Sequence, residues 1–382
     1  MNRPRSSLAL LIVTCSVALA APTFAAEGPV TLAVGAPAPD FDLPGTDGQR
    51  YSLASFEGSQ VLVLIFTANH CPTAQAYEER ILKLHADYED RGVQIVLVSP
   101  NDPLAVRLDE QSYSDLGDTL EDMKIRGQDQ GFTFPYLYDG ETQAMSRAYG
   151  PKATPHVFIF DSERTLRFVG RIDDNENPAK ADTTDTRDAI EALLAGKAVP
   201  VETTKVFGCS IKWSDKRDWV KKGYEDWAKE PVTLETIDLA GIEAVIRKDS
   251  MKLRLVNVWA TWCGPCVVEF PDLVSLHRIY RGRDFEVVTI GADTPERRDR
   301  ALDFLKEKQA STTNYAFDKG DPYALIEAVD AEWAGNLPHT ILVAPGGEII
   351  HRSDGAFDVL ELRRAIVGWL GRYYHSVPGG NQ

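Results

Sequence analysis

Positive charge, cysteine and long apolar runs are all scarce in this chain, and each shortage argues against a class of protein. The 382 residues carry 41 Lys and Arg against 57 Asp and Glu, which leaves a formal net charge of −16. No basic face is available for phosphates, so a nucleic-acid partner is not expected. Five cysteines are too few to hold a chain of this length as a disulfide scaffold. Beyond residue 21, no apolar run approaches the roughly 20 residues that a membrane-spanning helix needs.

One apolar run lies near the amino end, from Leu8 to Ala21, and it follows two arginines. Small residues up to Ala25 supply a cleavage site, so residues 1–26 are predicted to be a secretory signal peptide that is cleaved near Ala25. An uncleaved membrane anchor is the alternative, but the apolar core is short for a span. The exported chain would keep four cysteines: Cys71, Cys209, Cys263 and Cys266.

The pattern of the chain repeats once. In each half an apolar, β-branched run predicts a buried strand, which leads into a cysteine and then into a helical stretch. Each half continues with a second strand, an X-Pro-His run that enters a third strand, a fourth strand and an amphipathic helix. This order predicts an α/β layer fold, present twice. The predicted elements are strands 61–67, 93–99, 154–160 and 166–172 with helices 74–91 and 186–195, then strands 253–259, 285–292, 337–343 and 348–351 with helices 266–281 and 359–374.

Residues 214–230 separate the two halves. They are polar and charged with a helical pattern, which predicts a helical connector that packs loosely on one domain. Trp213, Trp219 and Trp227 are expected to serve packing, because large aromatic side chains are mostly buried.

The carboxyl half contains a two-cysteine motif in residues 257–271, NVWATWCGPCVVEFP. This segment resembles the active site of the thioredoxin superfamily, and its E-F-P is similar to the periplasmic TlpA and ResA type, over about residues 232–375. Cys263 lies at a strand-to-helix junction, where the helix dipole favours the attacking thiolate. Cys266 lies one helical turn further and can attack the mixed disulfide.

The resemblance implies roles for four more residues of this half. Trp262 would shield the rim of the site, and Pro338 would be a cis proline that faces the cysteines. Together with Leu337, Pro338 would hold an extended substrate chain. Glu269 would lie beneath the cysteines and tune their protonation, since burial raises the pKa of a carboxyl group. The alternative for Glu269 is an ordinary solvated helix residue.

The amino half reads VGAPAPDFDLPGTDGQRYSLASFEGSQVLVLIFTANHC over residues 34–71. It resembles the AhpC/TSA peroxiredoxin-like redoxins over about residues 31–212, in its G-x-x-A-P-D-F, its D-G turn and the strand that ends at Cys71. Peroxiredoxins carry Thr or Ser where this chain has Ala68. Thr154 and Pro155 would contact substrate as Leu337 and Pro338 do in the second half.

Cys71 lacks a second cysteine in its own motif, because Ala74 stands in that position. The other cysteine of this half is Cys209, in the segment FGCSIKW. Similar redoxin-like proteins end with such a segment, which supports a pairing of Cys71 with Cys209. Three states stay open for these two cysteines: a redox pair, a static disulfide and two free thiols.

A metal or haem is not expected. Zinc would require a second CxxC or an HxxxH partner, and the chain has neither. His70 beside Cys71 and His156 after Pro155 suggest copper or haem, but the missing second cysteine at Ala74 argues against both. No cofactor is predicted.

These observations predict two thioredoxin-like folds, each a central mixed sheet flanked by helices. The predicted domains are a signal peptide 1–26, a redoxin domain 31–212, a connector 213–231 and a thioredoxin domain 232–382. We expect an exported, periplasmic thiol–disulfide oxidoreductase that acts on protein disulfides and receives electrons from a membrane or soluble thiol reductant. Two alternatives are a thiol peroxidase with a built-in thioredoxin reductant, and an amino-terminal domain that only binds the client protein.

Overall fold

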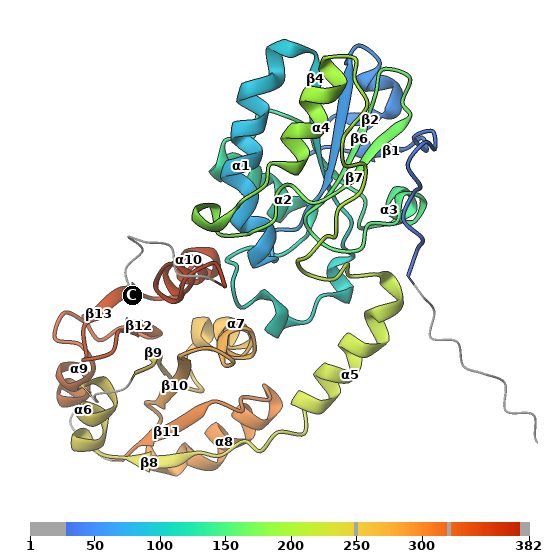
Figure 1. The fold of residues 1–382 in the computed structure, drawn as a ribbon. Coiled ribbons are helices and arrows are strands. Elements are labelled where there is room, and N and C mark those ends of the chain that lie inside the picture. The colour runs from blue at the N-terminus through green and yellow to red at the C-terminus, as the bar shows by residue number, and fades with distance from the viewer. Residues whose placement is uncertain (1–27, 248–250, 319–321, 375–382) are drawn as a thin grey trace, which may run out of the picture.

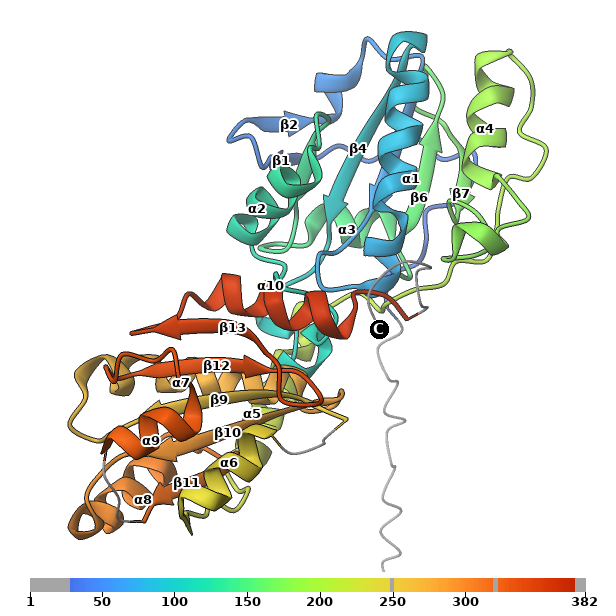
Figure 2. The same cartoon turned by 90° about the vertical axis from the view of Figure 1, so that its left-hand side faces the viewer.

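The computed structural model describes residues 28–247, 251–318 and 322–374, so the predicted signal peptide lies outside the described residues. The described chain forms two α/β units, each a mixed sheet flanked by helices, as the sequence predicts (Figures 1 and 2). In this part of the chain, no helix is both long and apolar enough to cross a membrane.

The first unit has a sheet with the strand order β5-β4-β3-β6-β7. The pairs β3·β4 and β4·β5 are parallel, whereas β3·β6 and β6·β7 are antiparallel. A separate hairpin, β1·β2, precedes the sheet. The elements of this unit are β1 (Asp42–Pro44), β2 (Arg50–Ser52), β3 (Val61–Phe66), α1 (Pro72–Tyr88), β4 (Val93–Ser99), α2 (Leu120–Gln130), β5 (Tyr136–Tyr138), α3 (Ala144–Tyr149), β6 (His156–Phe160), β7 (Leu166–Gly170) and α4 (Asp185–Leu194).

The second unit repeats this plan with one more strand, in the order β13-β12-β9-β10-β11-β8. Strands β8 to β11 run parallel, and β12 pairs antiparallel with both β9 and β13. Its elements are β8 (Glu235–Ile237), α6 (Leu239–Arg247), β9 (Leu253–Trp259), α7 (Gly264–Tyr280), β10 (Phe285–Gly291), α8 (Arg298–Glu307), β11 (Thr313–Phe317), α9 (Pro322–Val329), β12 (His339–Val343), β13 (Ile349–Asp354) and α10 (Val359–Leu370).

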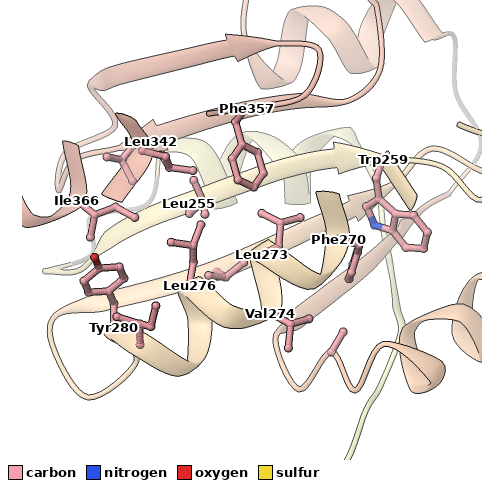
Figure 3. Close-up of a cluster of buried hydrophobic side chains, with 14 of the residues drawn as sticks. Leu255, Trp259, Phe270, Leu273, Val274, Leu276, Tyr280, Leu342, Phe357 and Ile366 are labelled. Atoms are coloured by element: carbon pink, nitrogen blue, oxygen red, sulfur yellow. The ribbon is translucent and has the colours of Figure 1, made fainter. Parts of the chain in front are cut away.

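The central strands β3 and β9 explain why the two halves fold alike. Every residue of both strands is buried, because helices cover both faces of each sheet. Figure 3 shows the core of the second unit, where Leu255 of β9 and Leu342 of β12 meet Leu273 and Leu276 of α7. This packing fixes the start of α7 at the end of β9, which is where the two-cysteine motif lies.

The end of the last helix differs from the prediction. The amphipathic pattern predicted a helix over 359–374, but α10 ends at Leu370. Gly371 has a φ of +86°, outside the helical region, and a glycine in that position is a common helix terminator. Residues 371–374 leave the helix and turn toward the first unit (Figure 2).

The connector forms helix α5 (Arg217–Trp227), and it contacts both units rather than one. Arg107 of the first unit lies over the Trp227 ring at 5.3 Å, and so does Arg278 of the second unit. Trp213 and Trp227 are buried, as predicted. The expected burial is wrong for Trp219, which is 50% exposed although the Arg107 guanidinium lies 4.7 Å from the centroid of its ring.

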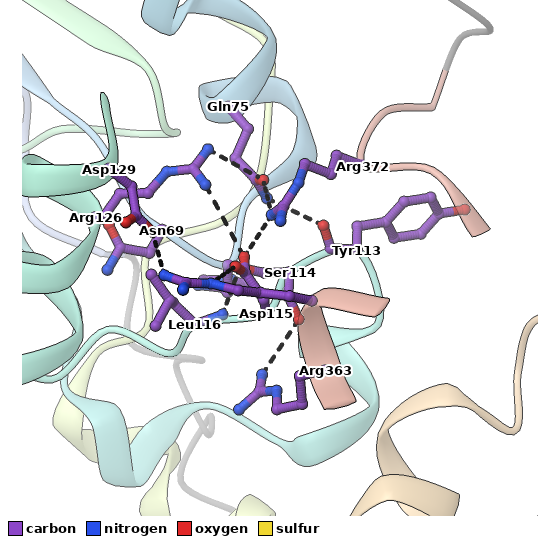
Figure 4. A network of polar contacts seen from close by, with 12 residues as sticks. Asn69, Gln75, Tyr113, Ser114, Asp115, Leu116, Arg126, Asp129, Arg363 and Arg372 are labelled. Atoms are coloured by element: carbon purple, nitrogen blue, oxygen red, sulfur yellow. Dashed lines mark hydrogen bonds and ion pairs between the residues drawn. The ribbon is translucent and has the colours of Figure 1, made fainter. Parts of the chain in front are cut away.

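A buried carboxylate joins the two units (Figure 4). Asp115 lies in the loop before α2 with a side chain that is 2% exposed. It pairs with Arg372 and, at 3.4 Å, with Arg364, both from the second unit. Burial alone would raise the pKa of Asp115, but the hydrogen bond and charge of Arg372 hold it below its ordinary value. This carboxylate therefore stays ionised at the interface.

The same loop offers its backbone carbonyls to the second unit. Tyr280 donates from Oη to the Ser114 carbonyl at 3.0 Å, and Arg363 donates to the same oxygen at 3.2 Å. Arg283 donates to the Ser112 carbonyl at 3.0 Å. Tyr280 is the last residue of α7, so the interface lies at the carboxyl end of that helix.

Candidate active site

The start of helix α7 holds the predicted pair of the second unit. Cys263 is the N-cap residue, and its Sγ accepts a hydrogen bond from the Cys266 N–H at 3.3 Å. The two cysteines are joined by a disulfide. Cys263 is 6% exposed and Cys266 is fully buried. An incoming sulfur can therefore reach Cys263, whereas Cys266 is accessible only from within the site.

A cavity of about 600 Å³ opens beside Cys263. Trp262, which is 61% exposed, and Leu337 both line it. The peptide bond between Leu337 and Pro338 is cis, as the resemblance predicts. Further apolar side chains from α9 and the segment after it complete the lining. A cavity of this kind suits an extended chain with apolar side chains.

Glu269 lies on α7, two turns after Cys263, and is 4% exposed. The solvated alternative for this residue is therefore wrong. Its carboxylate accepts hydrogen bonds from Asn257 Nδ2 at 2.9 Å and from the Phe357 N–H at 3.3 Å. Burial raises the pKa of Glu269 to about 7, and these hydrogen bonds only partly oppose the shift. The carboxyl group can therefore take up or release a proton near neutral pH.

Replacing Glu269 tests whether this proton is used. In Glu269→Gln we expect disulfide exchange at Cys263 to lose its inflection near pH 7 and to slow by about 100-fold at neutral pH, since general acid–base groups contribute on that order. The measurement is the pH dependence of the exchange rate. Glu307→Gln, which changes a carboxylate that is 71% exposed in the same unit, is the matched control. An unchanged profile in Glu269→Gln would assign Glu269 to packing alone.

The first unit places Cys71 in the equivalent position, as the N-cap residue of α1. Its side chain is fully buried, and its Sγ accepts from the Ala74 N–H at 3.3 Å. Its Sγ lies 3.3 Å from the Thr154 carbonyl oxygen, to which the thiol donates only when it is protonated. Cys209 packs against Cys71, and neither forms a disulfide. The structure thus brings the two predicted cysteines together with their thiols unbonded.

Cys209 is held by backbone pairing with Thr154, the residue before Pro155. The Thr154 N–H donates to the Cys209 carbonyl at 3.0 Å, and the Cys209 N–H donates to the Thr154 carbonyl at 3.3 Å. Gly208 allows this approach, because a Cβ at that position would lie 2.0 Å from the Thr154 carbonyl oxygen. In the first unit, the Cys209 segment therefore lies beside Thr154, the residue before Pro155. In the second unit, the equivalent residue Leu337 lines an open cavity instead.

The two thiols differ in acidity. Burial works against the Cys71 thiolate, but the hydrogen bond with Cys209 and the charge of His70 lower the pKa of Cys71 to about 6. The hydrogen bond to Cys71 and burial raise the pKa of Cys209. At neutral pH, Cys71 is the thiolate and Cys209 the thiol that donates to it.

The sequence did not predict two residues that lie near the Cys71–Cys209 pair. Asp118 lies 2.5 Å from His70, from a loop 48 residues away along the chain. Tyr374, the last described residue of the second unit, stacks edge-on against Tyr113 with ring centroids 4.9 Å apart. Burial, followed by the charges of Cys209 and Cys71, raises the pKa of Tyr374, which places this residue close to the cysteine pair. Neither contact has a local signal in the sequence.

The two histidines considered for metal, His70 and His156, have other contacts, and so does His339 of the second unit. His70 is paired with Asp118, and the ring of His156 accepts from the Lys152 N–H at 3.1 Å. Burial lowers the pKa of His156 to about 4. His339 is buried, stacks on Trp333 at 4.6 Å and pairs with Asp354 at 2.8 Å. Across the described residues, no three His, Cys, Asp or Glu side chains are grouped to hold a metal ion.

Comparisons with known proteins match one family to each half of the chain. The AhpC/TSA family matches residues 34–169, and the Redoxin family matches residues 231–366. Thiol:disulfide interchange protein HelX of Rhodobacter capsulatus is 34% identical over 106 residues, which are 27% of this chain and 53% of that protein. Thiol-disulfide oxidoreductase ResA of Oceanobacillus iheyensis is 29% identical over 127 residues, 33% of this chain and 58% of that protein. The chain thus spans less than two thirds of either relative.

Among solved structures, a hypothetical protein from Sinorhizobium meliloti shows 34% identity. The match covers 48% of this chain and 97% of that protein, with a TM-score of 0.43.

Proposed function

Because the chain consists of two redoxin-type domains in tandem, we propose that it is an exported thiol–disulfide oxidoreductase. The observation that carries the proposal is the Cys263–Cys266 pair at the start of α7, beside an open cavity. Its substrates are protein disulfides in the periplasm, and a soluble or membrane thiol reductant supplies the electrons. The signal peptide at residues 1–26 and its cleavage near Ala25 belong to this proposal.

The exchange at the second domain runs in two steps. The Cys263 thiolate attacks a client disulfide, so that one sulfur–sulfur bond forms and the client's own bond breaks, and the leaving thiolate takes a proton. Cys266 then loses its proton and attacks Cys263, which releases the second client thiol and leaves the Cys263–Cys266 disulfide. Two electrons pass to the client. Glu269, with its pKa near 7, accepts the Cys266 proton.

The groove beside Cys263 binds the client. Trp262 and Leu337 border it, and the backbone of Leu337 is the counterpart of the Thr154 backbone that holds the Cys209 segment in the first domain. Thr154 and Pro155 therefore hold a segment of this chain, and Leu337 and Pro338 hold a segment of another protein.

In the first domain, Cys71 and Cys209 form a second redox pair. The low pKa of Cys71 and the backbone pairing of Cys209 with Thr154 support this role. The thiolate of Cys71 attacks a disulfide, and Cys209 resolves the mixed disulfide. A static disulfide or two inert thiols are the competing states.

While the two domains are in contact, the Cys263–Cys266 pair and the Cys71–Cys209 pair act on separate partners. Cys263 caps the amino end of α7, whereas Tyr280 at the other end contacts the first domain. The 17 residues of α7 span about 25 Å at 1.5 Å per residue. Direct exchange between Cys263 and Cys71 of one chain therefore requires the domains to separate.

A redox titration tests the two-pair scheme. Exported chain is equilibrated in buffers of stepped potential, its free thiols are alkylated, and its crosslinks are mapped without reduction. We expect two crosslinks, Cys263–Cys266 and Cys71–Cys209, that both open reversibly above about −300 mV, since structural disulfides have lower potentials. A Cys71–Cys209 bond that stays closed throughout is static. Recovery of Cys263–Cys266 alone, with Cys71 alkylated in every buffer, reduces the first domain to a binding module.

A further inference from the structure

A buried ion pair lies directly before Cys71. His70 Nδ1 is 2.5 Å from Asp118 Oδ2, and the two side chains are 2% and 0% exposed. A carboxylate at this depth is costly unless it is both paired and hydrogen-bonded. The pair therefore needs further hydrogen bonds that keep both side chains charged.

Asp118 has those contacts. Its Oδ1 accepts from the Asn69 N–H at 2.8 Å and from the His70 N–H at 3.2 Å. Its Oδ2 accepts from Asn101 Nδ2 at 2.7 Å as well as from His70. Burial alone would raise the pKa of Asp118, but the charge and hydrogen bond of His70 hold it below its ordinary value. Four donors thus keep this carboxylate ionised.

The same carboxylate is connected to both cysteine segments. His70 and Asn69 immediately precede Cys71 in the chain. On the other side, Asn101 Oδ1 accepts from the Lys212 N–H at 2.9 Å, and Lys212 follows Cys209 by three residues. One hydrogen-bonded chain, from His70 through Asp118 and Asn101 to residue 212, therefore fixes the two segments relative to each other.

The charge of His70 acts on a thiol that has no exposure to water. Burial is the largest influence and opposes the imidazolium, but the charge and the hydrogen bond of Asp118 together raise the pKa of His70. Lys212 is the other cation close to this site, and it is paired with Glu110 at 2.5 Å.

The remaining titratable groups around the thiol carry no positive charge. Cys209 packs against Cys71, and Tyr374 lies close to the pair. Tyr136 donates from Oη to Asn69 Oδ1 at 3.0 Å. His70 is thus the cation held in place to offset a buried Cys71 thiolate.

We propose that His70 and Asp118 are positioning residues of the Cys71–Cys209 centre, in which the imidazolium, held by the carboxylate, stabilises the thiolate and stores its proton. Before exchange, the Cys71 proton passes to His70 while Asp118 stays ionised. When Cys71 attacks a disulfide, the new bond uses the Cys71 electron pair, and the leaving thiolate takes the proton from His70. The exchange step rests on the proposed function, whereas the ionisation of Cys71 does not.

The test is the thiolate titration of Cys71 in the full chain, with Cys15, Cys263 and Cys266 replaced by serine and with Cys71→Ser as the blank. The ultraviolet absorbance of the thiolate is followed against pH, which requires no access by a reagent. We expect a midpoint near pH 6 in the parent. In His70→Gln the midpoint should rise by at least about one pH unit, a tenfold fall in the thiolate-to-thiol ratio. His156→Gln, which replaces another buried histidine of this domain, should leave the midpoint in place.

The direction in which Asp118→Asn shifts the Cys71 midpoint distinguishes two explanations. If Asp118 acts through His70, loss of the carboxylate lets burial discharge the imidazole, and the Cys71 midpoint rises. If Asp118 is only a nearby negative charge, its removal favours the thiolate and the midpoint falls, which would overturn the proposal. A parent midpoint retained in His70→Gln would also overturn it.

A measurement without substitution at His70 or Asp118 covers the case in which these variants do not fold. The imidazole resonances of His70 are titrated in the parent with the Cys71–Cys209 pair open and then closed. We expect a charged imidazole at pH 7 whose midpoint falls when the disulfide removes the thiolate. A His70 that is neutral at pH 7 would refute the proposal. If the Cys71–Cys209 disulfide cannot be formed, the proposed function with two redox pairs is wrong. The titration of His70 in the protein with free thiols still tests the role of His70.

Discussion

Cys266→Ser is expected to turn the second domain into a covalent trap, whereas Cys263→Ser is expected to reduce disulfide exchange to the rate of the added reductant alone. Cys263 is 6% exposed and lies beside the cavity, so it is the sulfur that meets a client. Cys266 is fully buried and can act only on a bond that Cys263 has already formed. Removing the second thiol leaves the mixed disulfide with no internal route to resolution.

The measurement combines insulin reduction by dithiothreitol with non-reducing electrophoresis of protein from the exported compartment. The chain with Cys71→Ser and Cys209→Ser is the matched control, because it removes two thiols and leaves the second domain intact. It should retain insulin reduction. An active Cys263→Ser chain, or a Cys266→Ser chain without client adducts, would contradict the assignment of the attacking sulfur.

Asp115→Asn is expected to separate the two domains. The substitution leaves Arg372 and Arg364 without their shared buried partner, and breaking a buried ion pair on one side costs about 3–5 kcal/mol. The two arginines are partly exposed, so the lower end of that range applies. About 3 kcal/mol corresponds to a shift of more than about 100-fold in the ratio of docked to separated domains. Small-angle scattering should show a larger radius of gyration, and Cys209 should be alkylated faster once Tyr374 withdraws.

Asp129→Asn is the matched control for this prediction. Asp129 also pairs with Arg364, at 2.5 Å, but its side chain is 38% exposed. A surface pair of this kind contributes at most about 1 kcal/mol, so scattering and alkylation should stay as in the parent. Equal behaviour of the two variants would show that Asp115 does not hold the interface.

The parts of the fold that the sequence predicts well are those with a local signal. The strands before each cysteine are continuous apolar runs, and their burial on both faces follows from that pattern. The start of α7 is marked by Cys263 and Pro265, and the cis peptide before Pro338 follows from the family resemblance. The end of α10 also had a local signal, Gly371, but the prediction followed the amphipathic pattern past this glycine.

The parts that the sequence did not predict depend on distant contacts. Asp118 is one acidic residue among many in a polar loop, and only the folded chain brings it to His70. The contact between Asp115 and Arg372 joins residues 257 positions apart. The pairing of Cys71 with Cys209 could be expected only because few cysteines are available and related redoxins share the segment. Charge and hydrogen-bond networks of this kind leave no periodic pattern along the chain.

The backbone pairing between Thr154 and Cys209 has a kinetic consequence. A resolving thiol on the same chain competes at an effective concentration on the order of millimolar, however dilute the protein is. A free thiol at micromolar concentration would therefore lose to Cys209 by about a thousandfold at the mixed disulfide of Cys71. The lifetime of that adduct would be a property of this chain alone. The first domain would release its partner at the same rate in a thiol-poor compartment as in a thiol-rich one.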